Sequence, residues 1–295
     1  MNGATLVHPL DRPLGGAFEV AGVVRSSMVD GPGNRYVLFL QGCNFDCAAC
    51  HNPSTIGRCD GCGVCVEVCP HAALSIPVAG SVAFDGSCCD QCGDCRTGCP
   101  LDADPTIALM SVDDVVADLR RVSAYLNGIT VSGGEPTLQL PSVTALFARL
   151  RADPILSRLT TLVDSNGSLA AAGWRRLIPV LDGAMVDLKA GTPELHRRLA
   201  RHEQLPVIDS MRLLRRARKL TEVRLLVIEG VTDTPEELEA WASIVASVDP
   251  AVPVRLMAFR HTGTRRRARE WPETSPEALA RVASTLRSHG LSRVS

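Results

Sequence analysis

Short apolar segments alternate with stretches of helical periodicity along most of this chain. Six of these segments have the length and composition of buried strands. They cover residues 36–40, 128–131, 159–163, 183–188, 223–228 and 252–257. Because helical stretches separate them, they predict a parallel sheet covered by helices, an α/β fold of six β/α units. In such folds the active site lies at the carboxyl ends of the strands.

Capping residues mark where several helices begin. Ser111 with Asp114 three positions later forms a variant of the capping box, and Thr234 precedes a proline and then a glutamate. The last helix is expected to begin after Ser275 and to end at Gly290. Further helices are expected at about residues 142–150, 174–180 and 211–220.

Chemically active side chains follow these strands one after another. Cys43 follows the first strand, Glu135 the second and Asp164 the third. Lys189 follows the fourth strand and His261 the sixth. Because the carboxyl ends of parallel strands meet at one edge of the sheet, we expect these five side chains to lie near one another.

All twelve cysteines lie between Cys43 and Cys99, and eleven of them fall into three spaced sets. The sets are Cys43, Cys47 and Cys50; Cys59, Cys62, Cys65 and Cys69; and Cys89, Cys92, Cys95 and Cys99. The two four-cysteine runs share the pattern Cys-x2-Cys-x2-Cys-x3-Cys-Pro, which is typical of bacterial ferredoxins that hold [4Fe-4S] clusters. A three-cysteine run leaves one iron of a cluster free to bind another ligand. This indicates a cluster that takes part in a reaction rather than one that only stores electrons.

The repeated cysteine pattern predicts a small α+β module of the bacterial ferredoxin kind at residues 52–106. It would be inserted into a barrel domain made of residues 1–51 and 107–295. In two-cluster ferredoxins the fourth cysteine of each run binds the other cluster. One cluster would therefore take Cys59, Cys62, Cys65 and Cys99, and the other Cys89, Cys92, Cys95 and Cys69. Zinc is the alternative for Cys-x2-Cys pairs, and Cys88 is expected to be a thiol that binds no metal.

Charge and hydropathy exclude several classes of protein. The formal net charge of −1 predicts no bulk attraction to nucleic acid or to an anionic membrane. No stretch approaches 18 uninterrupted apolar residues, so no transmembrane helix is expected. The first residues, MNGATLVHPLDRPLGG, lack the basic start and apolar core of a signal peptide, which predicts a cytoplasmic protein with metal-binding rather than disulfide-bonded cysteines. The basic runs 212–219 and 265–269 are either solvated faces or a docking surface for an acidic partner.

The residues around the first cysteine set resemble the signature of radical S-adenosylmethionine (SAM) enzymes. The preceding residues 29–35, Val-Asp-Gly-Pro-Gly-Asn-Arg, and the Gln-Gly before Cys43 resemble the opening of glycyl radical enzyme activases such as pyruvate formate-lyase activating enzyme. Residues 162–167 and 182–189 resemble the YjjW-type members of that group. The resemblance runs from about residue 20 to near the C-terminus, and it implies a partial (β/α)6 barrel of the TIM type.

The resemblance also implies roles for individual residues. Cys43, Cys47 and Cys50 would hold a [4Fe-4S] cluster whose open iron binds the amino and carboxylate groups of SAM. Toward SAM itself, Gly133, Gly134, Glu135 and Asp164 would lie near the methionine amino group, Asp187 near the ribose and Lys189 at the carboxylate. A buried ligand that carries both charges needs opposite charges around it, which agrees with these residue types. Asp164, Met185 and Asp187 match residues that hold a monovalent cation in relatives.

Three positions concern the partner and departures from the family pattern. The resemblance implies that Asp30 lies near the glycyl loop of the partner enzyme. Ala49 stands where many relatives have an aromatic residue against the adenine of SAM. Many activases place a histidine directly after an aromatic residue past the sixth strand, whereas here Arg260 follows Phe259 and His261 comes one step later. Either of these two residues is a candidate to approach the ribose.

The function implied is reductive cleavage of SAM to a 5′-deoxyadenosyl radical that takes hydrogen from a backbone glycine of a glycyl radical enzyme. A flavodoxin or ferredoxin would supply the electron, and the full cofactor set would be three [4Fe-4S] clusters, SAM and a monovalent cation. Two alternatives are a radical SAM peptide-modifying enzyme of the anaerobic sulfatase maturase kind and an electron-transfer protein with a degenerate barrel. The auxiliary cysteines of sulfatase maturases usually follow the barrel, whereas these interrupt it.

Overall fold

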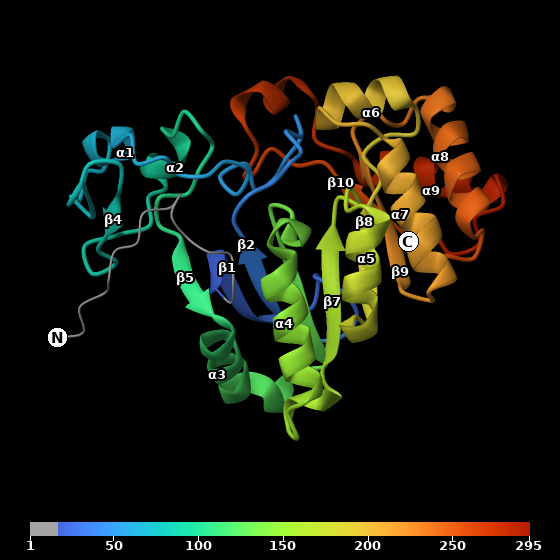
Figure 1. Cartoon of the computed structure of the whole chain (residues 1–295). Coiled ribbons are helices and arrows are strands. Elements are labelled where there is room, and N and C mark those ends of the chain that lie inside the picture. The colour runs from blue at the N-terminus through green and yellow to red at the C-terminus, as the bar shows by residue number, and fades with distance from the viewer. Residues whose placement is uncertain (1–16) are drawn as a thin grey trace.

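Figure 1 shows the computed structural model of the chain, which describes residues 17–295. Residues 1–16, which hold the segment inspected for a signal peptide and the start of the predicted barrel domain, lie outside the described residues. The strands of the main sheet are β1 (Ala17–Ser27), β2 (Arg35–Leu40), β5 (Ala108–Ser111), β6 (Gly128–Gly133), β7 (Thr160–Ser165), β8 (Gly183–Asp187), β9 (Leu220–Val227) and β10 (Val254–Ala258). They form one eight-stranded sheet in the order β10-β9-β8-β7-β6-β2-β1-β5.

Six of these strands are parallel and confirm the six strands expected from the apolar segments. β2 pairs with β6, and β6, β7, β8, β9 and β10 follow in sequence order, each parallel to its neighbour. Their carboxyl ends therefore meet at one edge, as predicted. Within residues 17–295 the sheet ends with β5 on one side and β10 on the other, which makes it a partial barrel.

Helices connect the parallel strands, and α4, α5 and α7 lie side by side on the outer face of the sheet (Figure 1). The helices are α3 (Val112–Val122), α4 (Leu140–Arg151), α5 (Ala171–Leu177), α6 (Pro193–Ala200), α7 (Leu205–Arg216), α8 (Pro235–Val248) and α9 (Pro276–Ser288). The expected caps are confirmed: Ser111 forms a capping box with Asp114, and the side chains of Thr234 and Ser275 cap α8 and α9. Gly290, just past α9, has a positive φ of 93°.

Helix α7 is placed earlier than the sequence predicted. The expected helix at 211–220 instead ends at Arg216, and Leu220 already begins β9. Arg218 adopts the left-handed conformation (φ 59°), and the Lys219 amide donates to the Leu214 carbonyl at 2.8 Å. A left-handed residue of this kind ends a helix, whatever the helical propensity of its neighbours.

Two antiparallel strands extend the sheet beyond the expected six units. β1 pairs antiparallel with both β2 and β5. Gly22 interrupts the apolar pattern of β1, and a register shift occurs beside it, which hides the strand from a search for strict alternation. Because β5 begins at Ala108, it attaches the chain that leaves residues 52–106 to the outer edge of the sheet.

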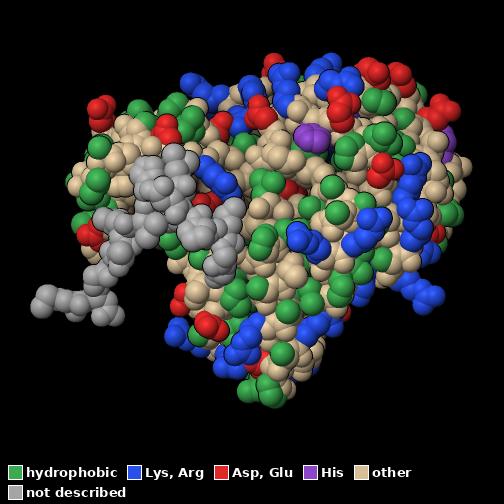
Figure 2. Space-filling model, viewed as in Figure 1, with side chains coloured by type: hydrophobic (Ala, Val, Ile, Leu, Met, Phe, Trp, Pro, Cys, Tyr) green, Lys and Arg blue, Asp and Glu red, His purple; other side chains and the backbone are tan. Residues whose placement is uncertain are grey.

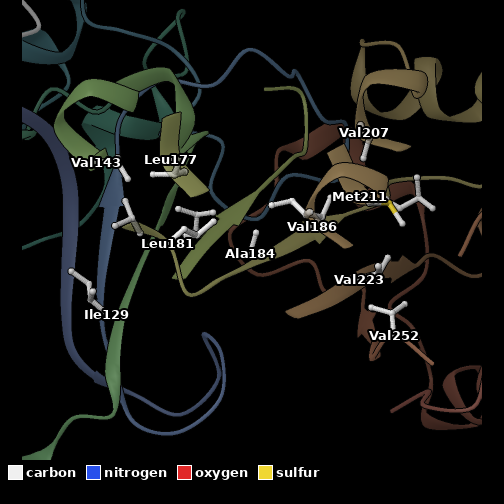
Figure 3. Packing of buried hydrophobic residues seen from close by; sticks show 14 of the residues in the cluster. Ile129, Val143, Leu177, Leu181, Ala184, Val186, Val207, Met211, Val223 and Val252 are labelled. Carbon is white, nitrogen blue, oxygen red and sulfur yellow. The ribbon is translucent and has the colours of Figure 1, made fainter. Parts of the chain in front are cut away.

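The main core fills the space between the sheet and its helices. Figure 3 shows Val186 and Val223 from the strands facing Val207 and Met211 from α7. These side chains are essentially inaccessible to solvent, and so is Trp174 of α5. Burying such side chains contributes roughly 1.5–3 kcal/mol each. The core therefore fixes the strands whose ends carry the predicted site residues.

The chain between β2 and β5, which holds the predicted module at 52–106, lies beside the β5 edge of the sheet (Figure 1). It contains two one-turn helices, α1 (Val64–Glu67) and α2 (Asp94–Thr97), and a two-stranded antiparallel sheet of β3 (Leu74–Ser75) and β4 (Ala83–Phe84). Left-handed glycines at the two repeated positions, Gly63 and Gly93, precede the helices with the same φ of 82°. Within residues 17–295, no helix is long and apolar enough to cross a lipid bilayer.

Candidate active site

A cavity of about 280 Å³ opens at the carboxyl ends of the parallel strands. Most of the side chains predicted to act together line it. They are Asp30, Cys43, Cys47, Cys50, Gly133, Gly134, Asp164, Asp187 and Lys189. Glu135 and His261, the other two predicted site residues, are not among the lining residues. The cavity is thus formed by segments more than 150 residues apart in sequence, brought together by the sheet.

The loop that carries the three cysteines is held from two sides. On one side, the Cys43 amide donates to the Ile56 carbonyl at 2.9 Å. On the other side, the amides of Asp46 and Ala48 donate to carbonyls at the C-terminal end of α6, at 3.1 and 2.7 Å. Helix ends have carbonyls without partners inside the helix, and here the loop supplies donors for two of them. The loop therefore has a fixed path above the sheet.

Burial shapes the acidity of the three thiols. Burial raises the pKa of Cys43 to about 12 and that of Cys47 to about 11, and it also raises the pKa of Cys50. The charge of Lys189 opposes this rise at Cys47 and Cys50. Thiols in such a place ionise only beside a strong positive charge, and an iron cluster supplies one. Three partly buried thiols that line one cavity thus suit a cluster better than they suit free cysteines.

Gly133 and Gly134 let the end of β6 pass close to the cysteine loop. A Cβ on Gly133 would lie 2.1 Å from the Leu40 amide nitrogen. A Cβ on Gly134 would lie 2.2 Å from the Gly42 carbonyl oxygen. Because no real side chain tolerates such distances, these glycines are required by backbone packing as well as by their place in the cavity.

Glu135 lies behind the cavity wall and is fully buried. Its Oε1 accepts hydrogen bonds from Thr137 and from the Ser165 hydroxyl at 2.9 Å, and its Oε2 accepts from the Asn166 amide at 2.7 Å. Burial raises its pKa, and these donors oppose that effect. Glu135 therefore ties the loop after β6 to the loop after β7 in this structure.

Asp164 lines the cavity, and Arg224 pairs with it. Its Oδ2 accepts from Arg224 at 2.8 Å and from Ser132 at 3.2 Å, whereas Oδ1 is buried without a hydrogen-bond partner in the described chain. Burial raises the pKa of Asp164 to about 6, even though Arg224 opposes the rise. The free oxygen is suited to a positively charged ligand group.

Arg224 is a site residue that the sequence reasoning missed. Its side chain is 7% exposed, and it pairs with Glu222 at 2.9 Å in addition to Asp164. One of its amino groups also lies 3.0 Å from the sulfur of Met185. The available signal was a charged residue inside an apolar strand, since Arg224 interrupts the run 223–228.

Lys189 and Asp187 form an ion pair at the cavity wall, 2.6 Å apart. Their side chains are 23% and 29% exposed, so they are not a solvated surface pair. Burial alone would lower the pKa of Lys189, because it disfavours the charged form. The negative charges of Asp187 and Cys47 outweigh this effect and raise the pKa of the lysine. The ammonium group is therefore charged and faces the space beside the cysteines.

Histidines near the rim differ in their placement. The His261 ring lies 2.7 Å from the Trp271 carbonyl oxygen and packs edge-on against Phe259. His51, which follows the third cysteine, lines the cavity instead. Its Nε2 lies 3.1 Å from the Arg260 carbonyl oxygen. No independent signal in the sequence pointed to His51, because its position depends on the fold of the loop after β10.

The module brings the remaining cysteines into the two groups expected for crossed ligation. A cavity of about 10 Å³ is lined by Cys59, Cys62, Cys65 and Cys99, here named the Cys59 set. A second cavity of about 20 Å³ is lined by Cys69, Cys89, Cys92 and Cys95, here named the Cys69 set. Cys88 lines neither. Across residues 17–295, no three His, Cys, Asp or Glu side chains are grouped tightly enough to hold a single metal ion.

Comparison with known proteins agrees with this geometry. The family described as the Radical SAM superfamily matches residues 37–242. The isethionate sulfite-lyase activating enzyme of Oleidesulfovibrio alaskensis is 30% identical over 83% of this chain and 84% of its own length. The indoleacetate decarboxylase activating enzyme of Tractidigestivibacter scatoligenes is 31% identical over 74% of this chain and 75% of its own. The chain belongs to the radical SAM glycyl radical enzyme activases.

A solved structure supports the fold of this activase. A radical SAM methyltransferase from Sphaerobacter thermophilus aligns with 93% of this chain and 76% of its own, with a TM-score of 0.54 and 16% identity. At that identity the likeness concerns the fold alone. It supports the mixed α/β fold with a parallel sheet.

Proposed function

We propose that this activase binds SAM in the 280 Å³ cavity and activates a glycyl radical enzyme from there. Activases of this family act on glycyl radical enzymes as protein substrates. When bound, the cluster and SAM supply the radical chemistry: one electron cleaves SAM to methionine and a 5′-deoxyadenosyl radical, which takes a hydrogen atom from a backbone glycine. The observation that carries the proposal is that three partly buried thiols and side chains of both charges line one cavity.

Cys43, Cys47 and Cys50 would hold the cluster, and the side chains around them would orient SAM. The free Oδ1 of Asp164 would accept a hydrogen bond from the methionine ammonium group, and the ammonium of Lys189 would pair with the methionine carboxylate. Both contacts are charge-assisted and would form in a partly water-excluded space, where such bonds are stronger than in water. Gly133 and Gly134 would approach SAM with their backbone, and Glu135 would act through the loops that it joins.

The nucleoside end of SAM would lie toward Asp187 and the rim. Ala49 is buried in a small cluster with Phe259, so it offers an apolar wall but no aromatic face to adenine. His261 would contact the ribose only by leaving the Trp271 carbonyl, whereas His51 already faces the cavity. A monovalent cation would use Asp164 and Asp187, whose carboxylates lie on the cavity wall beside the proposed carboxylate site.

Asp30 would meet the partner enzyme. It lines the cavity from the loop between β1 and β2. The Val29 carbonyl accepts from Arg255 at 3.4 Å, so this loop contacts β10, the last strand of the parallel series. A glycine-bearing loop of the partner would enter beside it.

The Cys59 and Cys69 sets would each hold a [4Fe-4S] cluster and would relay electrons from a flavodoxin or a ferredoxin. Each set lines its own small cavity, which supports the crossed ligand assignment. Thiolate clusters of this kind persist in a reducing cytoplasm, where we place the protein. On the face in Figure 2, Lys and Arg side chains are interspersed with Asp and Glu, which supports the expectation that nucleic acid is not a partner.

The test is anaerobic reconstitution followed by incubation with SAM, a reductant and candidate glycyl radical enzymes. We expect about twelve irons per monomer, which is three clusters of four irons. Electron paramagnetic resonance should then show a glycyl doublet on the partner that matches this activase. A stable content of four irons with bound zinc would remove the auxiliary clusters, and an absence of SAM cleavage in iron-replete enzyme would refute the proposed function.

A further inference from the structure

The short segment 54–57 joins the module directly to the active-site loop. The Gly42 amide donates to the Thr55 carbonyl at 2.8 Å, and the Cys43 amide donates to the Ile56 carbonyl at 2.9 Å. These bonds hold the backbone of the first residues after the active-site loop against the first active-site cysteine. The module therefore begins in contact with the active site.

The opposite side of the same segment holds the end of the module. The Gly57 amide donates to the Asp102 carbonyl at 3.0 Å, and Thr55 forms an isolated bridge with Ala103. A Cβ on Gly57 would lie 1.7 Å from the Leu101 carbonyl oxygen, so the two backbones touch. The active-site loop, segment 54–57 and residues 101–103 are thus stacked in consecutive contact.

The Cys59 set is attached to this stack at both ends. Cys59 follows Gly57 by two residues, and Cys99 precedes Asp102 by three. Consecutive Cα atoms lie about 3.8 Å apart, so both cysteines stay within about 12 Å of the contact. The Cys69 set is connected differently: its lining residue Thr106 leads into β5, which lies two strands away from β2 in the sheet. The Cys59 set is therefore the nearer of the two to the active site.

Arg265 links the active-site loop to the end of the module through two ion pairs. Its guanidinium pairs with the Asp46 carboxylate and, at 2.6 Å, with the Asp102 carboxylate. Asp46 lies inside the three-cysteine loop, and Asp102 lies in the last residues of the module. The Arg265 side chain is 13% exposed, and only a forked, always-charged group spans two carboxylates in this way. Arg265 thus connects the active-site loop to the module through side chains, where segment 54–57 connects them through backbone.

Resting on the proposed three-cluster function, we propose that Arg265 is a positioning residue that fixes the Cys59 set as the proximal electron centre. A donor of the flavodoxin or ferredoxin class would be oxidised by one electron. The clusters held by the Cys69 set and then by the Cys59 set would each be reduced and reoxidised once in passing that electron on. The cluster held by Cys43, Cys47 and Cys50 would be the final one-electron acceptor, so no other reactant would be needed.

The order of the centres is tested with two matched variants, Cys62→Ala and Cys92→Ala, which alter the same position of each repeated run. Reduced, reconstituted enzyme is examined by electron paramagnetic resonance for magnetic interaction between the active-site cluster and its neighbours. We expect Cys62→Ala to lose most of that interaction and Cys92→Ala to keep it. Loss with Cys92→Ala and retention with Cys62→Ala would overturn the order.

The role of Arg265 is tested by Arg265→Ala against Arg266→Ala, whose exposed side chain forms no ion pair within the described residues. With full iron content, Arg265→Ala should weaken the magnetic interaction, slow reduction of the active-site cluster by the protein donor and speed hydrogen exchange at residues 55–57. Arg266→Ala should change none of these, and Arg265→Lys should be intermediate. Wild-type values in iron-replete Arg265→Ala would overturn the inference.

A second variant covers the case in which Arg265→Ala loses iron. Asp102→Asn removes one charge from the clamp, and asparagine tolerates the left-handed φ of 51° at this position. It should show the same changes to a smaller extent, and wild-type behaviour would again overturn the clamp. Dithionite-driven SAM cleavage by the wild-type enzyme is measured in parallel. If it occurs while the clamp variants behave as wild type, only this inference fails; if it does not occur, the proposed function fails.

Discussion

The active-site cavity and the two module cavities use the same type of ligand in opposite surroundings. The first encloses about 280 Å³ and is lined by carboxylates, an ammonium and a guanidinium as well as three thiols. The other two enclose about 10 and 20 Å³ and have four thiols each, among mostly apolar walls. The three-cysteine site thus has space for a further ligand between groups of both charges, whereas the four-cysteine sites have no such space.

The two regions also differ in what holds them in place. The active-site cysteines lie on a loop held by segment 54–57 and by α6, and Cys43 and Cys47 pack against the main core. The module has one-turn helices and two-residue strands, and Cys62 and Cys92 are exposed. Small domains with little core depend on metal for their folding free energy. The barrel should therefore keep its fold without iron, and the module should not.

The largest expected effect separates the two kinds of cluster. Replacing Cys43, Cys47 and Cys50 with alanine should abolish SAM cleavage and leave about eight irons in the module. The reason is that these three cysteines are all the cysteine ligands proposed for the active-site cluster, so the variant cannot retain it. Iron analysis and anaerobic detection of 5′-deoxyadenosine measure the two results. Cleavage at the wild-type rate in this variant would contradict the radical SAM mechanism for this cavity.

Lys189→Ala should weaken SAM binding without disturbing the fold. The lysine faces the proposed carboxylate site, and truncating one partner of a desolvated charge pair across a binding interface costs about 2–5 kcal/mol of affinity. Equilibrium dialysis of SAM against reconstituted enzyme measures the loss. Lys219→Ala is the matched control, because Lys219 lies far from the cavity lining, at the start of β9. Unchanged affinity in Lys189→Ala would assign the lysine a structural role only.

The sequence predicted the fold because its strongest signals are local. The six parallel strands and the caps at Ser111 and Thr234 were visible as apolar runs and capping residues. β1 and β5 were not, because their pairing depends on distant segments and their burial is irregular. The end of α7 was also misplaced, since a left-handed arginine carries no clear sequence signal.

The site was predicted less completely, because sequence order indicates where a residue lies along the sheet but not where its side chain points. Sequence order after each strand placed Asp164 and Lys189 at the correct edge. It did not show that the Glu135 side chain turns away from the cavity to bond the loop after β7. Nor did it show that Arg224 reaches across to Asp164, because neighbours in a sheet are set by strand pairing.

The charge of Asp164 gives the active-site cavity a pH dependence. Burial raises its pKa to about 6, so the carboxylate is largely protonated below that pH. A SAM ammonium group requires the ionised form, so SAM affinity should rise as pH increases through about 6. The stability that Asp164 contributes to the fold changes with pH in the opposite direction to SAM affinity. The folded state binds the extra proton, so the stability contributed by Asp164 is full below its unfolded pKa of 3.8 and is lost as pH rises through about 6.

Binding titrations of SAM at several values on both sides of pH 6 measure this effect. Asp164→Asn is the control, because asparagine keeps the shape and cannot ionise. It should bind SAM more weakly, with affinity that no longer varies across this range. A pH dependence that survives in Asp164→Asn would belong to another group and would remove Asp164 from the ammonium site.

The smallest expected effect lies within the module, at two adjacent cysteines. Cys89 lines the cavity of the Cys69 set, whereas Cys88 is exposed and lies 3.8 Å from the Asp85 carboxylate. Cys88→Ser should therefore leave iron content and the spectrum of the reduced enzyme unchanged. Cys89→Ser should lose iron only in part, since Cys88 is close enough in sequence to replace the missing ligand. The double variant should lose about four irons, the content of one cluster. Loss of iron in Cys88→Ser alone would show that Cys88, rather than Cys89, is the cluster ligand and that the cavity lining does not identify the set correctly.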